Sequence, residues 1–174
     1  MSIENRDAPD PIDISAERPD SADASALILE LDAHLAPLYP AASRHGYSIE
    51  KLLAEGVDFF VLRRDGAPAA CGGLKAFSAD YGEVKRMYVR PQFRGLGFAK
   101  RVLQHLEAHA RGLGLPILRL ETGIHQRDAI GLYERMGFRR VGPFGEYRPD
   151  PLSVFFEKHI EAQGWNHGYP EGHT

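Results

Sequence analysis

The stretch "EVKRMYVRPQFRGLGFAKRVL", residues 83–103, decides the fold. Residues 82–89 are predicted to form a strand that stops at Pro91, because proline has no N–H to donate to a sheet. An amphipathic helix is predicted from Gly97 to Arg111. Gly95 and Gly97 lack side chains, so main-chain N–H groups can approach a ligand at the positive end of the helix dipole. This order of strand, loop and helix predicts a binding site for a phosphate group.

The letters RGLG occur a second time, at residues 111–114, where the predicted helix has ended. There Gly112 is expected as a left-handed C-cap and Gly114 as a turn residue before Pro116. A helix C-terminus presents carbonyl groups, which repel anions, so only the first copy is predicted to hold the ligand. That copy lacks the Gly-Lys-Ser/Thr end of a Walker loop, and Lys100 stands where a dinucleotide fingerprint needs its third glycine.

The size and composition are those of one ordinary globular domain. The chain has 174 residues, of which 43% are hydrophobic and 26% charged, which is enough for a core of its own. No apolar run approaches the roughly 20 residues that cross a bilayer. The N-terminus lacks an apolar signal segment, so a cytoplasmic location is expected. The single cysteine, Cys71, rules out an internal disulfide and is predicted to be a small buried residue.

Charge is distributed unevenly along the chain. Residues 1–25 hold seven acids against two arginines, whereas residues 84–106 hold six cations and no acid. A short cationic stretch of this kind suits a small polyanion. It is too short to argue for a nucleic-acid surface, so neither nucleic acid nor membrane is an expected partner.

The order of predicted elements is β, α, α, β, β, β, α, β, α, β. Strands are expected at 11–15, in 57–77 as two strands around an Asp-Gly turn, and at 82–89, 116–122 and 153–160. Helices are expected at 21–37, 48–56, 97–111 and 127–137. The connection through 97–111 is a crossover, so strands 82–89 and 116–122 should be parallel neighbours. Residues 1–10 are expected to be a flexible acidic segment and 161–174 a polar tail.

A second motif completes the pattern. Together with "LRLETGIHQRDAIGLYERMGF", residues 118–138, the first stretch resembles the GCN5-related N-acetyltransferase (GNAT) superfamily. The residues that match its motifs are Gln92, Gly95 and Gly97 in the pyrophosphate loop, then Ala129, Leu132, Tyr133, Gly137 and Phe138. The resemblance implies one α/β (α+β) domain over 11–160. Its sheet would be mixed and mostly antiparallel, with a splayed central parallel strand pair and helices on both faces.

The resemblance also implies acetyl-coenzyme A as co-substrate, with no metal. Its pyrophosphate would lie on the amides from Phe93 to Ala99, and its pantetheine arm would pair with the backbone of Met87 and Val89 as an added strand. Gln126 stands where the family often has asparagine. The implied cofactor-binding residues are Met87, Tyr88, Val89, Gln92, Phe93, Arg94, Gly95, Leu96, Gly97, Phe98, Ala99, Gln126, Ala129 and Tyr133.

Two side chains are candidates for the proton transfers. The resemblance places the Tyr133 hydroxyl near the coenzyme sulfur, as a general acid; the alternative is a core tyrosine that packs on Phe138. Glu83 is the candidate base. Lys85 shares its face of the strand and would lower the glutamate pKa, so a structural or substrate-binding carboxylate, with water as the base, stays open.

Other polar residues are assigned more simply. His105 and His109 have the i, i+4 spacing of metal ligands without a third ligand, so a solvated helix face is expected. His125 and Arg127 are expected near the acceptor pocket, either as substrate contacts or as ordinary loop residues, and Tyr147 is expected to border that pocket.

The predicted function is acetyl transfer from acetyl-coenzyme A to a primary amine by direct attack. The acceptor, a small molecule or a peptide, is not identified by the sequence. An acyl-coenzyme A-binding sensor without turnover and a nucleotide-binding module are the alternatives. Dimerisation is common in the family, and the chain does not decide it.

Overall fold

The computed structural model describes residues 11–161, so the predicted acidic segment 1–10 and all but the first residue of the tail 161–174 lie outside the described residues. The strands are β1 Ile12–Ala16, β2 Asp58–Arg64, β3 Ala67–Phe77, β4 Tyr81–Val89, β5 Ile117–Gly123, β6 Arg139–Val141 and β7 Ser153–His159. The helices are α1 Ala22–Leu35, α2 Ile49–Ala54, α3 Phe98–Gly112 and α4 Arg127–Arg135, with short 3-10 turns at Ala41–Ser43 and Pro91–Phe93.

The strands form a seven-stranded sheet in the order β1-β2-β3-β4-β5-β7-β6. All neighbours are antiparallel except β4 and β5, which are parallel. This confirms the predicted fold class, including the mixed sheet and the central parallel pair. The structure adds β6, a three-residue edge strand that the sequence did not predict.

The C-terminus of α3 corrects one prediction. Gly112 is the last helical residue and not the left-handed C-cap, a place that Leu113 takes with ordinary helical angles. The left-handed residue is Gly114, at φ +76°. The helix continues because the Leu113 N–H still bonds to the carbonyls of His109 and Ala110, and the chain turns only at the next glycine.

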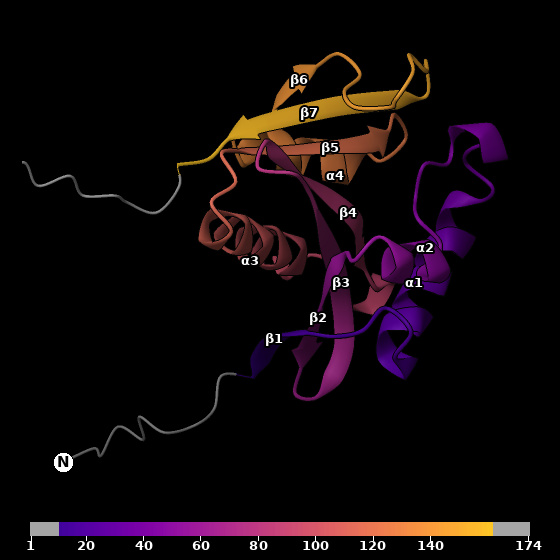
Figure 1. The fold of residues 1–174 in the computed structure, drawn as a ribbon. Helices are drawn as coiled ribbons and strands as arrows, with labels where there is room; N and C mark the ends of the chain where they lie inside the picture. Colours follow the sequence, from indigo (N-terminus) through magenta and orange to yellow (C-terminus); the bar gives the residue numbers. More distant parts are fainter. Residues whose placement is uncertain (1–10, 162–174) are drawn as a thin grey trace, which may run out of the picture.

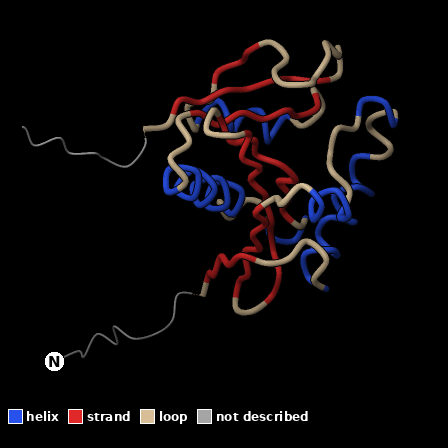
Figure 2. Tube along the Cα trace, in the orientation of Figure 1, coloured by secondary structure: helices blue, strands red, loops and turns tan. Residues whose placement is uncertain are grey.

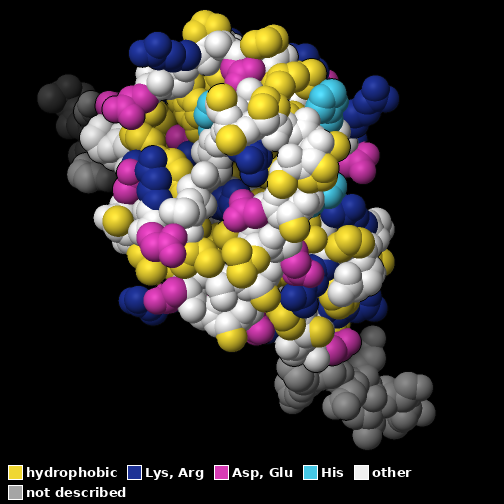
Figure 3. Space-filling view, turned by 90° about the vertical axis from the view of Figure 1, so that its right-hand side faces the viewer, with side chains coloured by type: hydrophobic (Ala, Val, Ile, Leu, Met, Phe, Trp, Pro, Cys, Tyr) yellow, Lys and Arg dark blue, Asp and Glu magenta, His cyan; other side chains and the backbone are white. Residues whose placement is uncertain are grey.

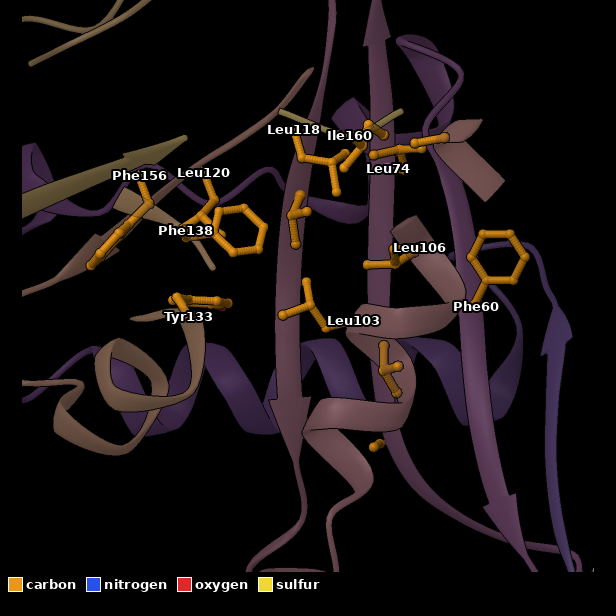
Figure 4. Packing of buried hydrophobic residues seen from close by; sticks show 14 of the residues in the cluster. Phe60, Leu74, Leu103, Leu106, Leu118, Leu120, Tyr133, Phe138, Phe156 and Ile160 are labelled. Atoms are coloured by element: carbon orange, nitrogen blue, oxygen red, sulfur yellow. The ribbon is translucent and has the colours of Figure 1, made fainter. Parts of the chain in front are cut away.

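Helices cover both faces of the sheet, as Figures 1 and 2 show. On one face α1 and α2 bury Leu27, Ile28 and Leu52 against β2 and β3. On the other, α3 and α4 pack on the sheet through Leu103, Leu106 and Tyr133; Figure 4 shows this cluster closing around Leu118 and Phe156. Each fully buried side chain of this size contributes about 1.5–3 kcal/mol to folding.

The two central strands separate soon after they pair. β4 and β5 are in register only at Gly82 with Leu118 and Glu83 with Arg119. Between β3 and β4 the register shifts, and the bulged residue Arg86 has φ +58°. A bulge bends its strand, so beyond Glu83 the edge of β4 that faces β5 has no strand beside it within the described residues. The main-chain groups along this edge are therefore free to pair with a ligand.

Gly72, which has no side chain, lies opposite the bulge. A Cβ atom on Gly72 would lie 2.7 Å from Met87 Sδ and 2.9 Å from Val102 Cγ1. The absence of a side chain at Gly72 thus allows α3 to pack directly on β3, beneath the bent part of β4.

Candidate active site

A cleft of about 850 Å³ opens where β4 and β5 separate. Its walls come from α1, the segment 36–48 between α1 and α2, the ends of β4 and β5, and the starts of α3 and α4. The predicted residues that line it are Glu83, Met87, Tyr88, Val89, Phe93, Arg94, Gly95, Gly97, Phe98, Ala99, Gln126, Ala129 and Tyr133. Two predicted residues do not line it: Gln92 lies in the 3-10 turn before the loop, and the Leu96 side chain is 48% exposed.

The loop before α3 has the features that an anion needs. Gly95 and Gly97 have φ of +79° and +78°, and a Cβ atom on either would face open space. α3 has no side-chain cap, so the amides of its first turn lack protein acceptors. The cleft lining holds seven Lys and Arg residues against three acids, a net charge of +4 in a chain of −3. These features fit a pyrophosphate group.

The six cations of 84–106 do not act together. Lys85 pairs with Glu83 at 2.9 Å, Arg86 with Asp32 at 2.5 Å and Arg90 with Glu30 at 2.8 Å. Three of the six charges are thus neutralised by carboxylates of the protein. Arg94 and Lys100 line the cleft beside the glycines, so they supply the field at the phosphate end.

Tyr133 combines the two predicted roles. Its ring packs at 5.7 Å from the Phe138 ring and 5.9 Å from that of Phe156 (Figure 4), and the residue is only 4% exposed. The same residue lines the cleft, and its hydroxyl makes no hydrogen bond with a described residue. Burial raises the pKa of Tyr133 well above its usual value. The hydroxyl therefore stays protonated and available as a donor at any physiological pH.

Glu83 lies in a buried polar cluster. Its Oε1 accepts hydrogen bonds from Lys85 Nζ at 2.9 Å and from the Tyr147 hydroxyl at 2.5 Å. The Lys85 ammonium also lies 3.9 Å from the centroid of the Tyr47 ring. Burial lowers the pKa of Lys85, although the neighbouring Glu83 carboxylate opposes the shift. The predicted contact between Glu83 and Lys85 is confirmed, and Tyr147 lines the cleft.

Glu121 is a second carboxylate at the cleft, and the sequence reasoning missed it. It lines the cleft from β5 and forms no ion pair with a described residue. Burial raises the pKa of Glu121, while the Ser153 hydroxyl and the nearby His45 and Lys85 side chains act in the opposite direction. A signal was available, because Glu121 is the single acid in the strand Ile117–Gly123.

Two loops close the end of the cleft beyond Glu121. The Tyr39 hydroxyl accepts a hydrogen bond from the His125 N–H at 2.9 Å, and a Cβ atom on Gly123 would overlap it at 2.1 Å. His45 meets the Tyr147 ring edge-on at 5.5 Å. The segment 36–48 is thereby fastened to the end of β5 and to the β6–β7 loop.

The remaining predictions concern residues away from this end. Cys71 is fully buried, and burial raises the pKa of its thiol to about 12. His109 pairs with Asp58 at 2.8 Å, and the rings of His105 and His109 both pack edge-on against Phe60. Within residues 11–161, no group of three or more metal-ligating side chains comes together. In the same range, no helix is long and apolar enough to cross a membrane.

Comparison with known proteins gives a consistent result. The model of the acetyltransferase (GNAT) family matches residues 28–138. A relative from Azospirillum brasilense, named IAA acetyltransferase, is 44% identical over 148 residues, which are 84% of this chain and 97% of that protein. A solved structure from Klebsiella pneumoniae, assigned as an acyl-CoA N-acyltransferase, is 36% identical with a TM-score of 0.74, covering 86% of this chain and 98% of its own.

A second similar structure contains the coenzyme. N-acetylglutamate synthase from Neisseria gonorrhoeae, solved with coenzyme A and N-acetyl-glutamate, is 25% identical with a TM-score of 0.66. The similarity covers 86% of this chain and 35% of that one.

Proposed function

Because the chain belongs to the acetyltransferase (GNAT) family, we propose that it transfers an acetyl group from acetyl-coenzyme A to a primary amine by direct attack. One observation carries the proposal. The glycine loop before α3, the unpaired edge of β4 and the side chains of Glu83, Glu121 and Tyr133 all open on the same cleft. An anion site, a strand edge and proton-transferring groups are thus within one ligand's reach.

Binding of the co-substrate is assigned to main-chain groups. The amides from Phe93 to Ala99, with Arg94 and Lys100 beside them, would hold the pyrophosphate. The β4 edge at Met87 and Val89 would pair with the pantetheine arm. Acetyl-coenzyme A would supply the acetyl group as a thioester, whose carbonyl the Val89 N–H would polarise. Gln126 and Ala129 line the cleft at the start of α4 and complete the proposed set.

Proton transfers are assigned to two side chains. Glu121 is the better placed base, because it has no cationic partner and its raised pKa brings it closer to that of an amine. Tyr133 is the acid that protonates the departing thiolate, since the residue lines the cleft and its protonated hydroxyl has no acceptor among the described residues. Glu83 remains the base predicted from the sequence, but Lys85 and Tyr147 already occupy one of its oxygens. Its proposed part is to hold that cluster in place.

Two further expectations belong to the proposal. The lone cysteine is buried, which suits a reducing compartment such as the cytoplasm. The relative from Azospirillum brasilense is named IAA acetyltransferase, so IAA belongs in any acceptor screen of this chain.

The test separates turnover from binding. Titration of acetyl-coenzyme A in a calorimeter should give a saturable heat, and thiol release should depend on an added amine. Tyr133→Phe should lower kcat at least about 100-fold, the low end of what a positioned acid contributes. The same variant should bind the coenzyme as before, because the ring packing is kept. Coenzyme binding without thiol release from any amine would support the sensor instead, and normal turnover by Tyr133→Phe would remove Tyr133 from the mechanism.

A further inference from the structure

We propose that the acetyl acceptor carries a carboxylate close to its amine, as an amino acid does, and that Arg44 binds this carboxylate. The inference rests on the proposed function and names the class of its acceptor. It comes from the charges that remain at the acceptor end of the cleft when every ion pair within the protein has been formed.

Most charges at this end are already neutralised. Lys85 is paired with Glu83, and their side chains are only 4% and 3% exposed. Arg86 is paired with Asp32 and also donates to the Ile28 carbonyl at 3.2 Å. Among the cleft-lining residues of β5 and of the segment 36–48, two charges are left over: the Glu121 carboxylate and the Arg44 guanidinium, which pair with no described residue. One free acid and one free base match the two charges of a zwitterion.

Arg44 is an exposed residue of the same cleft as Glu121, and contacts on both sides of Arg44 hold its segment in place. The segment 36–48 crosses the end of β5 where the Tyr39 hydroxyl lies against Gly123, two residues beyond Glu121. Figure 1 shows this segment, between α1 and α2, standing beside the ends of β5 and β7. Close packing of Gly46 against the Arg86 guanidinium, where a Cβ atom would lie 2.1 Å from Nη1, fixes the other side of Arg44.

His45 adds an independent sign of a missing polar ligand. Its Nε2 atom is buried and makes no hydrogen bond with any described residue, although Asp150 Oδ2 is 3.5 Å away. A buried polar atom without a partner is costly, and His45 lines the cleft next to Arg44. A carboxylate on Arg44 would provide the acceptor that this ring nitrogen lacks.

The same charges disfavour cationic acceptors. The Arg44 guanidinium lines the cleft and pairs with no described residue, so it would repel a second positive charge on a polyamine or a basic peptide. The face in Figure 3 shows basic and acidic side chains scattered among hydrophobic ones, with no continuous acidic surface for a polycation. The amine itself would be accommodated by Glu121, and the rest of the acceptor would meet the Arg44 guanidinium.

The experiment compares amino acids with their own carboxamides. Thiol release is measured for a panel of L-amino acids, each paired with the carboxamide of the same side chain. The carboxamide has the less basic amine, so more of it is in the reactive neutral form, and this bias acts against the proposal. For the side chain that the enzyme prefers, kcat/KM should be about tenfold higher for the carboxylate, as expected of a charge-assisted hydrogen bond.

Three variants locate the effect. Arg44→Gln should lower kcat/KM for the amino acid to within about twofold of its amide, with the amide unchanged, and Arg44→Lys should keep part of the preference. Arg148→Gln is the matched control, because Arg148 is an exposed arginine on the facing loop that does not line the cleft. It should behave as the unmodified enzyme does.

The possible failures are distinct. Equal use of acids and amides, or an equal loss of both in Arg44→Gln, would overturn the inference and leave the acetyltransferase proposal standing. If the coenzyme binds but no amine in the panel causes thiol release, both the proposed function and this inference are overturned.

Discussion

Replacing Glu121 by glutamine is the most direct test of how the site moves protons. The substitution keeps the shape of the side chain and removes its ability to accept a proton. Glu121 forms no ion pair with a described residue, so no partner is left with an uncompensated charge. Burial raises the pKa of Glu121, which means that its ionised form costs stability at neutral pH. The Tm of Glu121→Gln should therefore be unchanged or higher.

The expected effect on the reaction is large. A positioned general base contributes about 10²–10⁴-fold to the rate, so kcat should fall by that factor, or about 3–5 kcal/mol in activation free energy. The pH profile should change as well. Activity of the unmodified enzyme should rise with pH through a pKa above the ordinary glutamate range, since Glu121 must be ionised to act as the base. Only the titration of the acceptor amine should remain in the variant.

Glu83→Gln is the matched control for Glu121→Gln. It leaves the buried Lys85 ammonium without its carboxylate, and breaking a buried pair in this way costs about 3–5 kcal/mol of stability. Glu121→Gln should thus lose activity while its stability is kept, whereas Glu83→Gln should mainly lose stability. The measurements are thiol release between pH 6 and pH 10 and thermal unfolding of each protein. A kcat within about threefold of the unmodified enzyme, with the same pH profile, would show that Glu121 is not the base and return the role to Glu83 or water.

Two glycine substitutions test the frame around the site. Gly123→Ala places a Cβ atom on the Tyr39 hydroxyl, so it should displace the segment 36–48 and raise the acceptor KM more than the coenzyme Kd. Tyr39→Phe should lose only the hydrogen bond, about 1 kcal/mol of the free energy of unfolding. A normal acceptor KM for Gly123→Ala would contradict the bracing role. Gly72→Ala brings a Cβ atom within 2.9 Å of both Met87 and Val102, so it should lower the free energy of unfolding by about 1–3 kcal/mol. In urea unfolding, the double variant with Val102→Ala should lose less free energy of unfolding than the two single variants combined. Simple additivity would show that this contact is not tight.

The coenzyme half of the site is predictable because it is local. The strand, glycine loop and helix of 82–112 are continuous in the chain, and their geometry follows from the positions of Pro91, Gly95 and Gly97. A motif match does not show where each side chain lies in the folded chain. Gln92 matches the family motif, and the structure places it in the 3-10 turn Pro91–Phe93, outside the cleft lining. β6 was missed for a related reason, since three mostly exposed residues carry no periodic pattern.

The acceptor half could not be derived in this way, because its groups meet only in the folded chain. The Tyr147 hydroxyl reaches Glu83 across 64 positions of sequence, and Arg86 reaches Asp32 across 54. Neither distance leaves a local signal, yet these pairs decide which charges remain for a ligand. The six cations of 84–106 illustrate the consequence: their number predicts a polyanion, but only the ion pairs with α1 and within β4 show which of them can contact it. The proposed specificity for the acceptor therefore depends on the charges that the fold leaves unpaired, and Arg44 and Glu121 are the two that the segment 36–48 and β5 contribute to the cleft lining within residues 11–161.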